Sequence, residues 1–204
     1  MKRIDIVNYA NKLSGSEGHK EILQIYNKQN PLPRGYKVKS TDAWCATFVS
    51  AVFLKYNCNI FSECSCPKMI EKAKKAGIWI ENDAYKPTMG DVILYDWQDT
   101  GIGDNAGDAD HVGIVINVTN NTIYVREGNK SGTIGNRTLA INGKYIRGYI
   151  VPKFEDTKPL DIHRYKTIED LVNAIIRGDF GIGEDRKNRL YDYLQDLVND
   201  KLAK

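Results

Sequence analysis

The hydrophobic positions of the chain follow two different patterns along its length. At 2–13, 19–26, 44–53 and 68–76 they recur every three to four positions, which is the period of helices with a buried face. From residue 91 to residue 151 they fall instead in short β-branched runs separated by turn residues. Helices followed by strands in this way predict an α+β fold.

The strand pattern predicts an antiparallel sheet of about five strands. Asn120-Asn121 and Asn142-Gly143 are turn signals, and each joins the runs on its two sides into a hairpin. Residues 78–80 allow one further short strand. The main runs lie at 91–97, 109–116, 122–125, 137–141 and 145–151.

One predicted helix carries a cysteine at its start. Its apolar stripe runs from Trp44 to Phe53, and Thr41 or Asp42 can cap it. Cys45 therefore lies in the first turn, where free N–H groups and the helix dipole favour a thiolate. The alternative is that Cys45 is a small buried hydrophobic residue, since free cysteines are among the most buried residues.

A histidine, His111, lies at the entry of the strand at 109–116, and the next strand ends in Glu127-Gly128-Asn129. The hairpin turn between these strands sets His111 beside Glu127 or Asn129. Together with Cys45 they would supply a nucleophile, a base and a group that orients the base. His19 in a helix and His163 in a polar segment are expected to have no part in catalysis.

Four segments in this order resemble the CHAP domain, a papain-like family of cysteine amidohydrolases and peptidases related to the NlpC/P60 superfamily. The resemblance covers residues 1–154 and implies a papain-like catalytic domain acting on an amide of bacterial cell-wall peptide. It agrees with Cys45, His111 and Glu127 as catalytic residues, with Asn129 as the alternative orienting residue or a polar contact. The matching segments are Trp44–Ser50, Met89–Ile93, Asp110–Val115 and Glu127–Asn129.

The last part of the chain predicts a separate small unit. Residues 155–166 are polar and aperiodic, as in a linker, and 167–204 predict three short helices in a bundle. The first expected helix runs from Thr167 to Ile176. The second follows the glycine-rich turn and ends at Leu190, and the third runs from Tyr191 to Leu202.

This unit resembles the CW-seven repeat of phage lysins, which binds peptidoglycan fragments. The similarity lies in its Gly-x-x-Gly-x-Gly-x-x-Arg pattern, from Gly178 to Arg186. The chain has one repeat where the family often has several, so avidity would require oligomerisation, and the sequence leaves the oligomeric state open. Alternatively, the glycines only form a turn and the arginines are surface residues. The wall contacts that the resemblance implies are Asp179, Gly181, Gly183, Arg186 and Arg189.

Together the two resemblances imply a phage endolysin whose partner is bacterial peptidoglycan. An N-acetylmuramoyl-L-alanine amidase is favoured, and a stem-peptide or cross-bridge endopeptidase using the same triad is the alternative. Acyl transfer or deamidation on that triad is a further alternative. A catalytically inactive cell-wall-binding protein is the alternative of another class, although all three reactive residues are present.

Charge and hydropathy limit the other functions. The 204 residues contain 29 Lys and Arg against 26 Asp and Glu, a net charge of +3 without a basic patch, so nucleic-acid binding is not expected. Membrane insertion is not expected either, because no apolar stretch approaches about 18 residues. Asp5 and Asn8 interrupt any signal peptide. We therefore expect synthesis in the host cytoplasm, and the resemblance to phage lysins implies action on the wall after release through a separate pore.

The remaining cysteines do not predict a metal site. Cys58, Cys64 and Cys66 lack the paired spacing of zinc ligands and have no histidine nearby, so we expect thiols. A Cys58–Cys64 disulfide after release is an alternative. We expect no metal or other cofactor.

The glycine- and aspartate-rich segment 96–110 leaves calcium binding open. Its spacing does not follow the EF-hand pattern, and a solvated loop beside the active cleft is the simpler interpretation. The oxygen ligands for calcium would come from Asp96, Asp99, Asp104 and Asp108.

Overall fold

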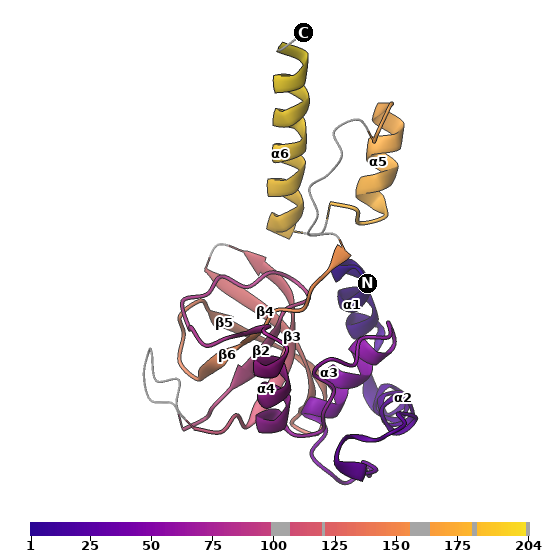
Figure 1. Cartoon of the computed structure of the whole chain (residues 1–204), viewed down its shortest axis with the longest axis vertical. Coiled ribbons are helices and arrows are strands. Elements are labelled where there is room, and N and C mark those ends of the chain that lie inside the picture. Colours follow the sequence, from indigo (N-terminus) through magenta and orange to yellow (C-terminus); the bar gives the residue numbers. More distant parts are fainter. Residues whose placement is uncertain (99–106, 120, 156–163, 181–182, 203–204) are drawn as a thin grey trace.

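The computed structural model describes residues 1–98, 107–119, 121–155, 164–180 and 183–202. Helices precede the sheet along the chain, and two further helices follow it (Figure 1). The predicted α+β class is confirmed. The first group comprises α1 (Arg3–Lys12), α2 (Gly15–Asn27), a 3-10 turn (Pro33–Gly35), α3 (Cys45–Leu54) and α4 (Cys66–Lys75).

The sheet is antiparallel and has six strands in the order β1-β6-β2-β3-β4-β5. The additional strand over the predicted five is β1, which pairs with β6 at one edge. The predicted hairpin between β3 and β4 is confirmed, and its register sets Gly113 opposite Glu127, although Asn120 lies outside the described residues. The hairpin expected at Asn142-Gly143 is wrong, because β5 and β6 are not neighbours in the sheet and β6 pairs with β1 and β2. The strands are β1 (Trp79–Ile80), β2 (Val92–Tyr95), β3 (His111–Thr119), β4 (Thr122–Lys130), β5 (Thr133–Ala140) and β6 (Ile146–Ile150).

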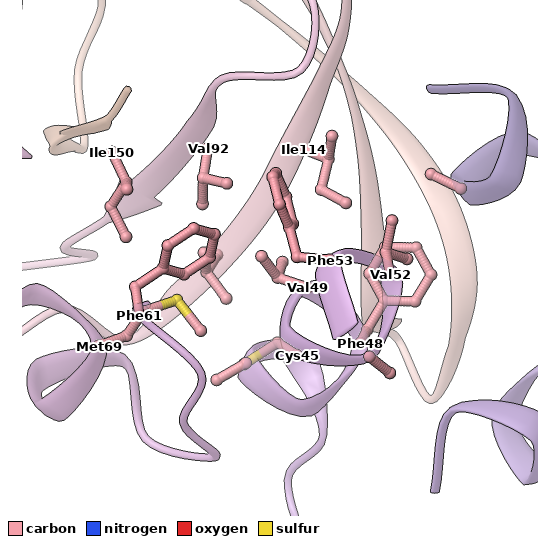
Figure 2. Close-up of a cluster of buried hydrophobic side chains, with 14 of the residues drawn as sticks. Cys45, Phe48, Val49, Val52, Phe53, Phe61, Met69, Val92, Ile114 and Ile150 are labelled. Carbon is pink, nitrogen blue, oxygen red and sulfur yellow. The ribbon is translucent and has the colours of Figure 1, made fainter. Parts of the chain in front are cut away.

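Helix α3 is the centre of the main core. Every residue from Cys45 to Phe53 is buried, because α2 packs on one side of the helix and β3 and β4 on the other. Figure 2 shows Val49 and Phe53 of this helix facing Val92 and Ile114 of the sheet, with Cys45 at the edge of the cluster. The apolar body of the helix thus anchors the cysteine at its first residue.

Gly128 allows α3 and β4 to approach closely. A Cβ atom at this position would lie 2.3 Å from the Cβ of Phe48 and 2.9 Å from the Trp44 ring. The glycine is therefore required by packing, and it directly follows Glu127 on the strand.

The expected three-helix bundle at 167–204 is wrong, since the described residues of this unit form two helices. These are α5 (Ile168–Ile176) and α6 (Gly183–Leu202), and α6 continues through Leu190 and Tyr191 where we expected a break. No glycine or proline interrupts the sequence between 184 and 202, so nothing ends the helix there. A small core of Ala174, Phe180 and Tyr193 joins the two helices.

The start of the chain contacts the C-terminal unit. Lys2 Nζ lies 3.3 Å from Asp179 Oδ1, and Gly178 packs against Ile4. The Met1 amino group pairs with Glu155, the first residue of the expected linker. Residues 156–163 of that linker lie outside the described residues. None of the described helices combines the length and the hydropathy needed to cross a membrane.

Candidate active site

Cys45 is the first residue of α3 and is 7% exposed. Its backbone N–H is among the first four of the helix, which have no acceptor within the helix. The position thus combines a sulfur atom with free N–H groups at the positive end of a helix, an arrangement that stabilises negative charge.

His111 is the first residue of β3 and lies against an aromatic wall. It pairs with Tyr95 across the β2–β3 ladder, and its ring stacks near Tyr95 and Trp97 at centroid distances of 5.8 and 5.9 Å. The imidazole is 8% exposed. Strand register and ring packing together therefore restrict its orientation.

Glu127 approaches His111 from β4. Its Oε2 atom lies 3.2 Å from His111 Nε2, which is ion-pair distance, although the ring N–H is not aligned on the oxygen. Arg137 on β5 donates from Nε to the other carboxylate oxygen at 2.6 Å. Glu127 is fully buried, and Arg137 supplies the charge that its burial requires.

Asn129 lies two residues further along β4, where the register with β5 is irregular. Its φ angle is 57° and its side chain is half-buried. The carboxylate that the structure brings to His111 is Glu127, so Asn129 is not needed as the orienting group.

The thiol and the imidazole change one another's charge state. Hydrogen bonding with Cys66 and then with His111 lowers the pKa of Cys45 to about 5, against the effect of burial. Burial alone would lower the pKa of His111, but hydrogen bonding to Cys45 and the negative charges of Cys45 and Glu127 raise it to about 9. A thiolate–imidazolium pair is therefore favoured between these pH values.

Since Nε2 of His111 faces Glu127, Nδ1 is the nitrogen available to the sulfur. Burial would raise the pKa of Glu127, but the hydrogen bond from Arg137 and the positive charges of His111 and Arg137 lower it. The carboxylate thus stays ionised and can hold the imidazolium in one orientation.

Sequence reasoning missed Cys66. Its Sγ atom lies 3.7 Å from Sγ of Cys45, and both side chains are buried. Cys66 is the first residue of α4, as Pro67 at the helix start could have indicated. Its approach to Cys45 depends on tertiary packing and has no local signal. Among the described residues all four cysteines are free.

His19 of α2 packs beside the start of α3. Its ring is half-buried and stacks on Trp44 at 4.2 Å, and burial lowers its pKa. It also lines a surface pocket of about 520 Å³ together with Lys20 and Lys37. His19 therefore packs against Trp44, the residue that precedes Cys45. His163 lies outside the described residues.

The candidate wall-binding residues occupy different environments. Asp179 is buried, and its carboxylate lies 3.1 Å from Arg177 and 3.3 Å from Lys2, so it is held by cations within the protein. Arg186 is exposed on α6 and Arg189 is half-buried. Gly183 is the first residue of α6, whereas Gly181 lies outside the described residues.

The described residues contain no group of three or more His, Cys, Asp or Glu side chains arranged to hold a metal ion. Asp96 accepts a hydrogen bond from the backbone N–H of Gln98, and Asp110 accepts one from Trp97. Asp99 and Asp104 of the calcium alternative lie outside the described residues.

Two segments of the chain match known families. Residues 35–129 match the CHAP domain, and residues 169–202 match the CW_7 repeat. The first match includes Cys45, His111, Glu127 and Asn129, and the second includes the five candidate wall contacts. Comparison with curated proteins and with solved structures gave no match in either case.

Proposed function

We propose that this chain, which contains a CHAP domain followed by a CW_7 repeat, is a cysteine hydrolase that cleaves an amide bond of bacterial peptidoglycan. The CHAP domain implies such a hydrolase, either an amidase or an endopeptidase, and the repeat suggests binding to cell-wall material. The observation that carries the proposal is the buried series from Cys45 through His111 to Glu127, which favours a thiolate paired with an oriented imidazolium.

In the proposed reaction the thiolate of Cys45 attacks the amide carbonyl carbon, and the carbonyl oxygen takes the negative charge. The Cys45 backbone N–H, free at the start of α3, stabilises that oxygen. His111 donates its proton to the departing amine, which leaves a thioester on Cys45. The neutral imidazole then takes a proton from water as the water attacks the thioester, and the carboxylic acid product leaves.

The first candidate bond is the amide between the muramoyl group and L-alanine, and an endopeptidase bond in the stem or cross-bridge is the second. Both are amides open to the same attack. Mass spectrometry of digested wall distinguishes them, because the amidase frees intact stem peptides from the glycan whereas an endopeptidase leaves part of each stem attached. New amino termini found only within stems or cross-bridges would exclude the amidase.

Catalysis is tested by replacing the nucleophile. Wild type and Cys45→Ala are compared for clearing of purified Gram-positive cell wall, with circular dichroism as the control for folding. We expect clearing by the wild type alone, and no effect of a chelator, because the proposed steps use protein groups only. Equal clearing by both proteins would end the cysteine mechanism, and no clearing by either would favour an inactive binding protein.

Wall binding is tested separately in the Cys45→Ala protein, which does not destroy its own target. Arg186→Ala and Arg189→Ala should each reduce sedimentation with purified wall if α6 contacts anionic or polar groups of peptidoglycan. Lys187→Ala is the matched control, since Lys187 is an exposed cation on the same helix outside the proposed contacts. Unchanged binding by both arginine variants would remove them from the binding surface.

The proposed compartment follows from the proposed substrate. The protein would be made in the cytoplasm of an infected bacterium and reach the wall through a separate membrane pore, as an endolysin does. Fractionation of cells expressing the chain alone tests this route. The protein should stay with the cytoplasm until the membrane is permeabilised, whereas spontaneous appearance outside the cells would contradict it.

A further inference from the structure

We propose that Cys45 and Cys66 form a reversible disulfide, in which Cys66 captures Cys45 after oxidation by a peroxide. The inference rests on the proposed function only in assigning Cys45 as the nucleophile whose activity is lost. The modification itself is a property of the two thiols and can be measured without any substrate.

The distance between the sulfurs carries the argument. Their separation of 3.7 Å is a direct contact, and a disulfide bond of about 2.05 Å needs an approach of about 1.7 Å. Each cysteine is the first residue of its helix, so each follows a non-helical residue that can adjust. The start of each helix is therefore the part of the chain that bond formation would move.

The other two cysteines are in different environments. Cys64 accepts a hydrogen bond from the Arg34 guanidinium at its sulfur, at 3.0 Å. Cys58 is half-buried on the loop that follows α3, and burial raises the pKa of its thiol. Cys66, by contrast, is the cysteine whose sulfur contacts Sγ of Cys45.

The charge states of Cys45 and Cys66 favour a reaction in two steps, in which Cys45 is oxidised first and Cys66 then attacks it. His111 lies beside Cys45, so Cys45 carries the negative charge and Cys66 remains the thiol that donates a hydrogen bond to it. Hydrogen bonding to Cys45, together with burial, raises the pKa of Cys66. When Cys45 becomes a neutral sulfenic acid this first cause disappears, and the start of α4 then favours the Cys66 thiolate.

In the first step the Cys45 thiolate attacks one oxygen of hydrogen peroxide. An S–O bond forms, the O–O bond breaks and hydroxide leaves, which becomes water on protonation. In the second step Cys66 loses its proton and its sulfur attacks the sulfur of the sulfenic acid. The S–S bond forms, the S–O bond breaks, and the oxygen leaves as a second water. A dithiol returns the two electrons by thiol–disulfide exchange.

The disulfide would stop oxidation at a recoverable stage. A sulfenic acid without a neighbouring thiol can proceed to the sulfinic and sulfonic acids, which a dithiol does not reverse. Cys66 would thus protect the nucleophile during exposure to peroxide, at the expense of activity until the bond is reduced.

The full chain is treated with hydrogen peroxide, alkylated, cleaved after Lys55 and Glu63, and analysed by mass spectrometry. Cys64 and Cys66 fall in one peptide, so the Cys64→Ser variant assigns the bond. We expect a Cys45–Cys66 disulfide in wild type and in Cys64→Ser, with both thiols recovered after dithiothreitol. Sulfinic acid at Cys45 with Cys66 still a free thiol in the wild type would overturn the proposal.

Wall clearing provides a second measurement. Oxidation should lower the wild-type rate at least about tenfold, since the disulfide removes the nucleophile, and dithiothreitol should restore it. The same peroxide treatment should inactivate the Cys66→Ser variant, and dithiothreitol should not restore its activity. Recovery equal to that of the wild type would contradict the role of Cys66. Cys66→Ala replaces it if the serine variant does not fold. If the wild type clears no wall at all, the proposed function fails, whereas the peptide map still decides the disulfide.

Discussion

Gly128→Ala tests whether the crossing of α3 over β4 sets the catalytic geometry. The new Cβ would lie 2.3 Å from Phe48 Cβ, whereas carbon atoms in contact are about 3.5 Å apart, so about 1.2 Å of separation must be gained. A change of rotamer cannot provide it, because Phe48 Cβ is fixed to the helix backbone. Either α3 or β4 must therefore move.

The displacement would act on the catalytic residues directly. Cys45 is three residues before Phe48 on α3, and Glu127 is adjacent to Gly128 on β4. A misplacement of about 1 Å between catalytic groups costs on the order of 10²-fold in rate. Overpacking a core typically costs about 1–3 kcal/mol of stability. We therefore expect a folded variant with a lower Tm and a clearing rate reduced about 100-fold.

The measurement is the initial rate of wall clearing, below the Tm of the variant, with circular dichroism to verify the fold. Gly135→Ala is the matched control, because Gly135 pairs with Glu127 on the neighbouring strand. Its Cβ would meet only the flexible side chain of Lys130, at 3.1 Å. A Gly128→Ala protein with the wild-type rate and Tm would refute the role of this crossing.

Three further predictions concern the charges around the site and the repeat. Glu127→Gln should slow clearing by about 10²–10⁴-fold. It should also move the alkaline limit of the pH profile to lower pH, because the carboxylate helps to raise the pKa of His111. A clearing rate equal to that of the wild type would contradict this prediction. The clearing rate of the wild type should rise through about pH 5, as Cys45 loses its proton, and fall through about pH 9, as His111 loses its proton. A rate that stays constant across both pH values would exclude the thiolate–imidazolium pair. Asp179→Asn should lower Tm, because Lys2 and Arg177 of the protein pair with this carboxylate, but it should leave sedimentation with the wall unchanged below the transition temperature. Loss of wall binding with an unchanged Tm would instead make Asp179 a contact to the wall.

The sequence could predict the hairpin that places His111 near Glu127, because both the turn and the strand periodicity are local signals. It could also place Cys45 in the first turn of a helix from the apolar stripe, but the expected cap by Thr41 or Asp42 is wrong, since Trp44 is the N-cap residue and makes no side-chain cap hydrogen bond. The choice between Glu127 and Asn129 needed the irregular register at the end of β4, together with the Arg137 contact from a third strand. Neither has a signature within a single segment.

Two other features depend on contacts between distant segments. Cys66 reaches Cys45 because the loop that follows α3 brings the start of α4 beside the start of α3. The spacing of the cysteines along the sequence does not reveal this contact. Asp179 is a predicted wall contact within its motif, and its pairing with Lys2 from the opposite end of the chain has no local signal. Local pattern identifies such residues without identifying their partners.

The pairing of Lys2 with Asp179, and of Ile4 with Gly178, has a consequence for building chimaeric enzymes. A fusion that joins this repeat to another catalytic unit at the linker would leave a buried aspartate without one of its cations and an apolar surface uncovered. Grafting the first few residues together with the repeat would preserve both contacts, so the transferable piece is discontinuous along the chain.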